Sequence, residues 1–164
     1  MNVKILMVLT THDRLGNTGR KTGFWLEELA APYFVFRDAG VEVTLASPKG
    51  GPPPIDPRSD LPESQTLAMT RFEPDTPAQK ELSQTVKLSD IESEHFDTMF
   101  YVGGHIPMWD FIDNPDSIAL IESFYNSGKP VAAVCHSAAV FHRVMSLPAS
   151  AEAVMELLAA RKAA

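Results

Sequence analysis

Four short, largely apolar runs are spaced along the chain and constrain its fold more than any other feature. They cover residues 3–9, 41–46, 96–102 and 131–134. The first run is almost continuously apolar, which is typical of a strand buried on both faces of a parallel sheet. Stretches with helical periodicity lie between the runs. The pattern therefore predicts one α/β domain over residues 1–164, with a doubly wound, mostly parallel, flavodoxin-like sheet and helices on both faces.

A proline-rich stretch interrupts this alternation. Residues 51–77 hold seven of the thirteen prolines of the chain. We interpret residues 51–95 as an insertion within the domain, because strand and helix patterns resume after the prolines. Thr76 followed by Pro77 predicts the start of a helix with Thr76 as its N-cap. The insertion either walls a pocket or only covers an edge of the sheet.

Cys135 is the only cysteine, and it directly follows the last apolar run. The surrounding sequence predicts a buried strand, a sharp turn and the start of a helix. A thiol at this place points toward a helix N-terminus, where free N–H groups favour the thiolate. His136 follows and could move protons. The alternative is that Cys135 is a small buried hydrophobic residue.

Charge and cysteine content narrow the function classes. A net charge of −7 argues against nucleic acid and anionic membranes as partners. A single cysteine excludes an internal disulfide, which suits a reducing compartment. The apolar N-terminus is too short to span a bilayer and lacks the features of a signal peptide. We therefore expect a cytoplasmic protein. The histidines show no ligand spacing that predicts a metal site.

Four motifs together resemble a known superfamily. They lie at residues 21–28, 46–51, 101–105 and 132–136. These segments are similar to those of the ThiJ/PfpI superfamily, which has the class I glutamine amidotransferase-like fold. The spacing from Thr22-Gly23 to Glu28 and the Cys-His pair resemble its branch of heat-shock chaperone-like, glutathione-independent glyoxalases.

The resemblance implies roles for the matched residues. Cys135 would be the nucleophile and His136 its proton shuttle. Glu28, rather than Glu27, occupies the acidic position; a buried, protonated Glu28 could donate a hydrogen bond to the sulfur. The alternative for Glu28 is a solvated charge on a helix face, which is what we expect of Glu27. Gly104 and the backbone N–H of His136 would form an oxyanion hole.

The implied reaction is the conversion of a 2-oxoaldehyde such as methylglyoxal to a 2-hydroxy acid, with no metal or organic cofactor. A glycated amine is a related substrate. His105 and Trp109 are candidates for the pocket lining. A homodimer is expected, because a shortened sheet would expose apolar surface. Two alternatives stay open on the same fold: a non-catalytic stress chaperone (holdase) and a cysteine redox sensor.

Three features depart from the superfamily pattern. Ile106 replaces a glycine after Gly-Gly-His, and Ser137-Ala138 replaces Gly-Pro after Cys-His. The larger departure is a family segment that is missing near residues 145–147. The chain runs from there almost directly into a final helix, with Val154, Leu157 and Leu158 on one apolar face.

Overall fold

A parallel sheet of five strands, in the order β3-β2-β1-β4-β5, forms the centre of the computed structural model, which describes residues 3–105 and 107–144. Every neighbouring pair of strands is parallel. This confirms the predicted fold class. The strands are β1 (Lys4–Val8), β2 (Glu42–Ser47), β3 (Val86–Lys87), β4 (Thr98–Tyr101) and β5 (Val131–Ala133).

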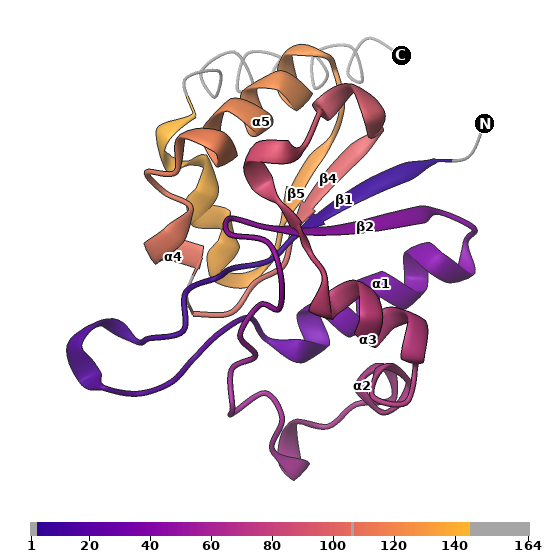
Figure 1. The fold of residues 1–164 in the computed structure, drawn as a ribbon, viewed down its shortest axis with the longest axis vertical. Helices are drawn as coiled ribbons and strands as arrows, with labels where there is room; N and C mark the ends of the chain where they lie inside the picture. Colours follow the sequence, from indigo (N-terminus) through magenta and orange to yellow (C-terminus); the bar gives the residue numbers. More distant parts are fainter. Residues whose placement is uncertain (1–2, 106, 145–164) are drawn as a thin grey trace, which may run out of the picture.

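Helices cover both faces of the sheet (Figure 1). On one face lie α1 (Leu26–Asp38), α2 (Leu67–Phe72) and α3 (Thr76–Ser83). On the other lie α4 (Pro107–Asp110), α5 (Pro115–Asn126) and the 3-10 helix η5 (Cys135–Arg143). Short 3-10 turns complete the described elements: η1 (Gly16–Thr18), η2 (Pro62–Ser64), η3 (Leu88–Asp90) and η4 (Ser93–His95).

The central strand β1 divides the core in two. Ile5 and Met7 belong to the cluster that packs with α1, whereas Leu6 and Val8 belong to the cluster that packs with α5. All four side chains are at most 3% exposed. Successive residues of a strand point to opposite faces, so a strand between two helical layers must be apolar at every position. This is why the first apolar run is nearly unbroken.

Side-chain caps fix where two of the helices begin. Asn114 accepts hydrogen bonds from the backbone N–H groups of Asp116 and Ser117 at 3.0 and 3.1 Å, and α5 starts at Pro115. For α3 the predicted cap is wrong by one residue. Asp75, not Thr76, accepts the capping bond, from the Ala78 N–H at 2.9 Å. A carboxylate is the stronger acceptor here and also complements the helix dipole.

Removal of the α5 cap should lower stability by about 1 kcal/mol, because two N–H donors lose their partner. We expect Asn114→Ala to reduce the melting temperature by roughly 2–4 °C. The matched control is Asn126→Ala at the exposed, opposite end of α5, which should change it by less. Thermal unfolding followed by circular dichroism measures both. An unchanged melting temperature for Asn114→Ala would contradict the capping role.

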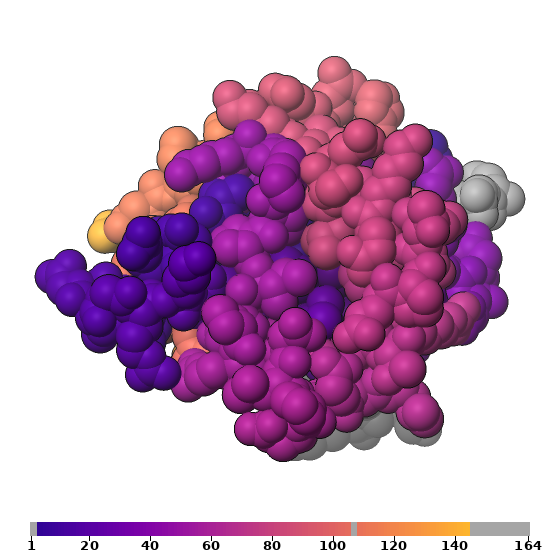
Figure 2. All heavy atoms as spheres, turned by 60° about the horizontal axis from the view of Figure 1, so that its bottom comes forward, coloured from indigo at the N-terminus to yellow at the C-terminus, as the bar shows by residue number. Residues whose placement is uncertain are grey.

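The proline-rich segment packs against the chain that enters α1. The Phe24 N–H donates to the Pro54 carbonyl, and the Asp56 N–H donates to the Phe24 carbonyl, both at 2.9 Å. At the start of the segment, Gly51 forms an antiparallel β-bridge with Thr85, which directly precedes β3. Figure 2 shows this segment as a continuous surface next to the indigo loop that follows β1. The segment therefore both covers a sheet edge and reaches the entrance of α1.

None of the described helices is long and apolar enough to cross a membrane. The predicted missing segment near 145–147 and the final helix with Val154, Leu157 and Leu158 lie outside the described residues, as does Ile106.

Candidate active site

The turn after β5 holds Cys135 in an unusual backbone conformation. Its φ is +56°, which among the described residues is the only positive φ at a residue other than glycine. The left-handed region costs a side-chain-bearing residue about 1–2 kcal/mol, and such strain is concentrated at functional sites. The predicted sharp turn is therefore present. It lies at the carboxyl edge of the parallel sheet, where ligands bind in doubly wound folds.

Ser137 stabilises this turn through hydrogen bonds to backbone carbonyls. It is fully buried, its N–H donates to the Val134 carbonyl at 3.1 Å, and its hydroxyl donates to the Tyr101 carbonyl at 3.1 Å. The hydroxyl also contacts the Val134 carbonyl. The serine that replaces the superfamily's glycine thus ties the turn to the end of β4 and to the last residue before Cys135.

Cys135 and His136 form a close, exposed pair. The sulfur of Cys135 lies 3.1 Å from Nδ1 of His136, and both residues are exposed. The alternative interpretation of Cys135 as a buried hydrophobic residue is therefore wrong. A thiol at hydrogen-bond distance from an imidazole can transfer its proton to the ring and become a nucleophilic thiolate.

The first turn of α1 brings Glu28 to the same place. Gly103 separates the two groups: a Cβ built on it would lie 2.1 Å from Oε2 of Glu28 and 2.6 Å from Cβ of Cys135. The two side chains therefore border one small space, which only a glycine at position 103 leaves open. Oε2 of Glu28 is buried and has no hydrogen-bond partner of normal geometry within the described ranges. The neighbouring Glu27 accepts a hydrogen bond from Thr66, so the expectation of a free, solvated Glu27 is wrong.

Burial raises the pKa of Glu28 above its ordinary value. The interaction with the Cys135 thiol and the charges of His136 and His105 oppose this change, but burial prevails. Burial has this effect because a carboxylate loses hydration in a low-dielectric site. A carboxyl that keeps its proton is a hydrogen-bond donor, and Cys135 is the neighbour that could receive that bond when ionised.

Gly104 adopts a conformation that requires glycine. Its φ is +125°, and a Cβ there would lie 2.7 Å from the Gly23 carbonyl oxygen. The adjacent Gly103 carbonyl accepts a hydrogen bond from the Trp25 N–H at 3.1 Å, which ties this loop to the start of α1. The loop backbone thus comes close to the site, as the predicted oxyanion hole needs. The role of Gly104 and of the His136 N–H stays a prediction.

The two candidates for the pocket lining lie in different surroundings. His105 lies beside the Cys-His pair, since its ring centroid is 5.2 Å from that of His136, and it packs edge-to-face with Trp25 at 6.3 Å between ring centroids. Trp109, on α4, instead stacks on His12, with ring centroids 6.0 Å apart. Next to Trp109, the half-buried Asp110 accepts hydrogen bonds from the hydroxyl of Thr10 at 2.8 and 2.9 Å, fixing α4 to the end of β1.

Two residues of the proline-rich segment also reach the site, and sequence reasoning missed them. Asp56 is 1% exposed, and its Oδ2 lies 3.6 Å from Nδ1 of His105. Nη2 of Arg58 lies 3.2 Å from the same nitrogen. The Asp56-Pro57 dipeptide predicts a turn. Nothing in the sequence around it indicates a contact with His105, which follows Arg58 by 47 residues.

Comparison with known protein families identifies a match over most of the chain. Residues 21–151 match the model of the DJ-1/PfpI family. The chain belongs to the DJ-1/PfpI family. That match spans Glu28, Gly104 and the Cys135–His136 pair. The resemblance inferred from the motifs is thereby confirmed at the family level.

Two similar proteins are called glyoxalases. Glyoxalase 3 of Candida albicans is 29% identical over 145 residues, which are 87% of this chain and 61% of that protein. The crystal structure of glyoxalase III from the same organism superposes with a TM-score of 0.76 and 30% identity, over 85% of this chain and 59% of that one. The X-ray structure of the rapid encystment protein of Francisella tularensis gives a TM-score of 0.81 and 32% identity, over 87% and 62%. This family member thus spans about three fifths of the length of these relatives.

The raised pKa of Glu28 gives a testable pH dependence of stability. The carboxyl keeps its proton to higher pH in the folded chain than in the unfolded chain, where the ordinary value is 4.5. The stabilisation that this provides is complete below the unfolded pKa and is lost as the pH rises through the folded-state pKa. Glu28→Gln has no such proton to lose. Its free energy of unfolding relative to the wild type should therefore increase between acid and neutral pH.

Urea unfolding over that pH range measures the difference. Glu63→Gln, on the exposed surface, is the matched control for the loss of one carboxylate. A difference between Glu28→Gln and wild type that stays constant or shrinks toward neutral pH would contradict a protonated, buried Glu28.

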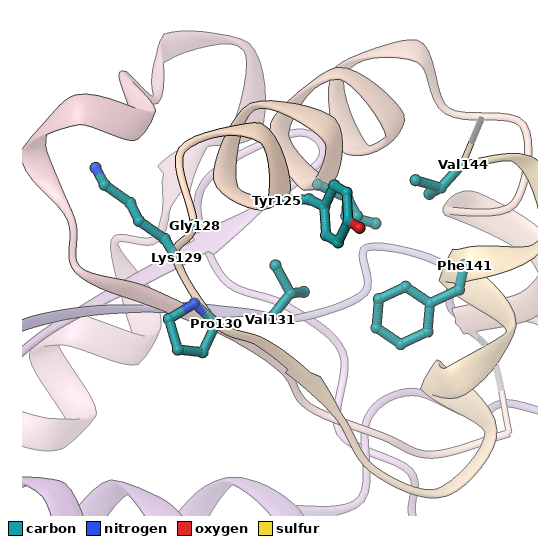
Figure 3. Close-up of a pocket in the computed structure, with 8 residues that line it drawn as sticks. Tyr125, Gly128, Lys129, Pro130, Val131, Phe141 and Val144 are labelled. Carbon is teal, nitrogen blue, oxygen red and sulfur yellow. The ribbon is translucent and has the colours of Figure 1, made fainter. Parts of the chain in front are cut away.

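A separate hollow of about 430 Å³ lies at the amino end of β5, whereas Cys135 follows its carboxyl end (Figure 3). Apolar side chains of α5, β5 and η5 line most of it: Ile121, Tyr125, Val131, Phe141 and Val144. Among the residues that the structure describes, no group of three or more His, Cys, Asp and Glu side chains is arranged to hold a metal ion.

Proposed function

We propose that this family member is a glutathione-independent glyoxalase that uses Cys135 as its nucleophile. The observation that carries the proposal is the left-handed Cys135, with its sulfur 3.1 Å from His136 and the buried carboxyl of Glu28 beside it. A strained, exposed thiol between a base and a buried acid is a costly arrangement for structure alone. The glyoxalase names of the Candida albicans relatives support the same reaction.

The reaction proceeds by addition, proton transfer and hydrolysis. The Cys135 thiolate adds to the aldehyde carbon of the 2-oxoaldehyde, and the carbonyl oxygen takes up a proton, which gives a hemithioacetal. His136 removes the hydrogen on that carbon, and the resulting enediol is reprotonated at the neighbouring carbon. The product is a thioester of a 2-hydroxy acid on Cys135. Water then cleaves the thioester, which releases the acid and restores the thiol.

Glu28 and the glycine loop act on the charges that these steps create. A protonated Glu28 donates to the sulfur and stabilises its anion before attack and after release. The backbone around Gly104 and the N–H of His136 face the oxygen that becomes negative during addition. The same first step on a glycated amine would make the protein a deglycase. The homodimer and the cytoplasmic location stay predictions.

The test is formation of D- or L-lactate from methylglyoxal by the purified full chain without glutathione. We expect turnover that added glutathione does not increase, because Cys135 supplies the thiol that glutathione gives to other glyoxalases. The control is bovine serum albumin at equal thiol concentration, which accounts for uncatalysed adduct formation. A folded chain that consumes methylglyoxal no faster than albumin would overturn the proposal.

A holdase is the second candidate, and the apolar hollow beside β5 is the observation that favours it. Apolar surface next to a sheet edge is what an unfolded client binds. Suppression of the aggregation of heated citrate synthase, equal in wild type and Cys135→Ala, would support this function. Suppression that needs Cys135, or none at all, would argue against it.

A further inference from the structure

The contact between Arg58 and His105 bears on where the imidazole carries its proton. Nη2 of Arg58 lies 3.2 Å from Nδ1 of His105. A guanidinium only donates hydrogen bonds, so this contact favours an Nδ1 that accepts and carries no hydrogen. The Asp56 carboxylate, 3.6 Å from the same nitrogen, favours a hydrogen there. The contact with Arg58 is the shorter of the two, and a neutral ring with a bare Nδ1 has its N–H at Nε2.

Asp56 holds Arg58 in the position that makes this contact. The Arg58 backbone N–H donates to Oδ1 of Asp56 at 2.9 Å, and the guanidinium Nε lies 3.6 Å from the same oxygen. Thr22, at the entrance of α1, donates its hydroxyl to Oδ2 at 2.9 Å. Burial opposes ionisation of Asp56, but these hydrogen bonds and the charge of Arg58 outweigh it and lower the pKa of the carboxyl. Asp56 is thus a fixed anion that anchors the guanidinium.

The His105 ring lies beside the Cys135–His136 pair. The two ring nitrogens lie on different edges of an imidazole, so the Nε2–H faces away from Arg58. The centroid of the His105 ring is 5.2 Å from that of the His136 ring. At 38% exposure the ring is accessible to a ligand.

We propose that Asp56 and Arg58 are positioning residues that hold His105 as a neutral Nε2–H donor to the substrate oxygen next to the aldehyde. This rests on the proposed glyoxalase function. A neutral donor stabilises the negative oxygen of the enediol step. A charged His105 would instead repel a proton on His136, which must accept one during the reaction. The proline-rich segment thereby contributes to the site across the entrance of α1.

The direct test is the tautomer itself. Multiple-bond ¹H–¹⁵N NMR of the full chain at neutral pH distinguishes the three forms of each imidazole, and His105→Gln assigns the signal. We expect a protonated Nε2 and a bare Nδ1 in the wild type. In Arg58→Met, Nδ1 keeps only the Asp56 carboxylate, 3.6 Å away, and we expect it to become protonated. A protonated Nδ1 in the wild type, or an unchanged pattern in Arg58→Met, would overturn the proposal.

Kinetic measurements distinguish a positioning role of Arg58 from a purely structural role. Arg58→Met should lower kcat about 10- to 100-fold with little change in KM, because the donor acts on the enediol rather than on binding. Arg58→Lys keeps a donor at Nδ1 and should restore part of the rate and the wild-type tautomer. Arg71→Met removes an equally exposed arginine from an ion pair with Asp38, and should leave both readouts unchanged. An unaltered kcat in Arg58→Met would reject the positioning role.

The two proposals fail in different ways. A chain without glyoxalase turnover, whose His105 tautomer still changes in Arg58→Met, would reject the glyoxalase function and with it the donor role toward that substrate. A chain with full turnover and a protonated Nδ1 in the wild type would reject the His105 arrangement alone.

Discussion

Cys135→Ser should lower the turnover of methylglyoxal at least about a thousandfold. Serine preserves the shape of the side chain but not its acidity, because a hydroxyl stays protonated where a thiol beside an imidazole ionises. The Sγ–Nδ1 pair at 3.1 Å would be replaced by a hydroxyl–imidazole pair, and the proposed thiol nucleophile would be absent. Lactate formation under saturating substrate measures the loss.

The substitution should leave the fold intact. Cys135 is exposed, so replacement of its sulfur removes little packing and should change stability by less than about 0.5 kcal/mol. Equal melting temperatures for the two chains would assign the lost turnover to chemistry. Turnover within tenfold of the wild type would show that the thiol is not the nucleophile, and Cys135→Ala would check that the serine does not replace it.

Gly103→Ala should damage the site, although it adds only one methyl group. Its Cβ would lie 2.1 Å from Oε2 of Glu28 and 2.6 Å from Cβ of Cys135, as well as 2.6 Å from the Val134 carbonyl oxygen. The backbone oxygen cannot yield, so Glu28 and the Cys135 turn must shift. Displacement of a catalytic group by about 1 Å costs on the order of a hundredfold in rate. Overpacking of this kind also costs about 1–3 kcal/mol of stability.

The matched control for Gly103→Ala is Gly128→Ala. Gly128 follows α5 and has a φ of +69°, with nothing within 4 Å of an added Cβ. Its substitution should destabilise the chain by about 1–2 kcal/mol through backbone strain while leaving kcat unchanged. Assays well below both melting temperatures then separate stability from activity. A Gly103→Ala chain with wild-type kcat would contradict the close approach of Glu28 to Cys135.

The sheet could be predicted because its central strands are recognisable in the sequence as apolar runs. Residues 5–9 of the first apolar run are buried on both faces, and no polar alternation obscures them. The short elements β3 and α4 could not be predicted from the sequence. Val86–Lys87 of β3 is exposed, and Pro107–Asp110 of α4 is a single turn, so neither has a period long enough to detect. Their positions come from tertiary contacts, such as the bonds of Asp110 to Thr10.

Some residues of the candidate site could likewise be predicted from the sequence, and others could not. Cys135 and His136 are neighbours in sequence, so their pairing could be expected from the strand and turn that carry them. Glu28 could be matched only by resemblance, and its approach to Cys135 through the gap at Gly103 required coordinates. Asp56 could not be anticipated, because its partners Thr22 and His105 lie on separate loops. Prolines restrict the backbone of the segment that contains Asp56, but they do not predict which part of the fold the segment contacts.

The most direct test of the account is acid quench of the full chain during turnover of methylglyoxal, followed by mass spectrometry of the peptide that contains Cys135. We predict a lactyl thioester on Cys135 that forms and decays as fast as lactate appears, and that is absent in Cys135→Ser. Lactate production with an unmodified Cys135, or an adduct that accumulates without release of lactate, would contradict covalent catalysis by this cysteine.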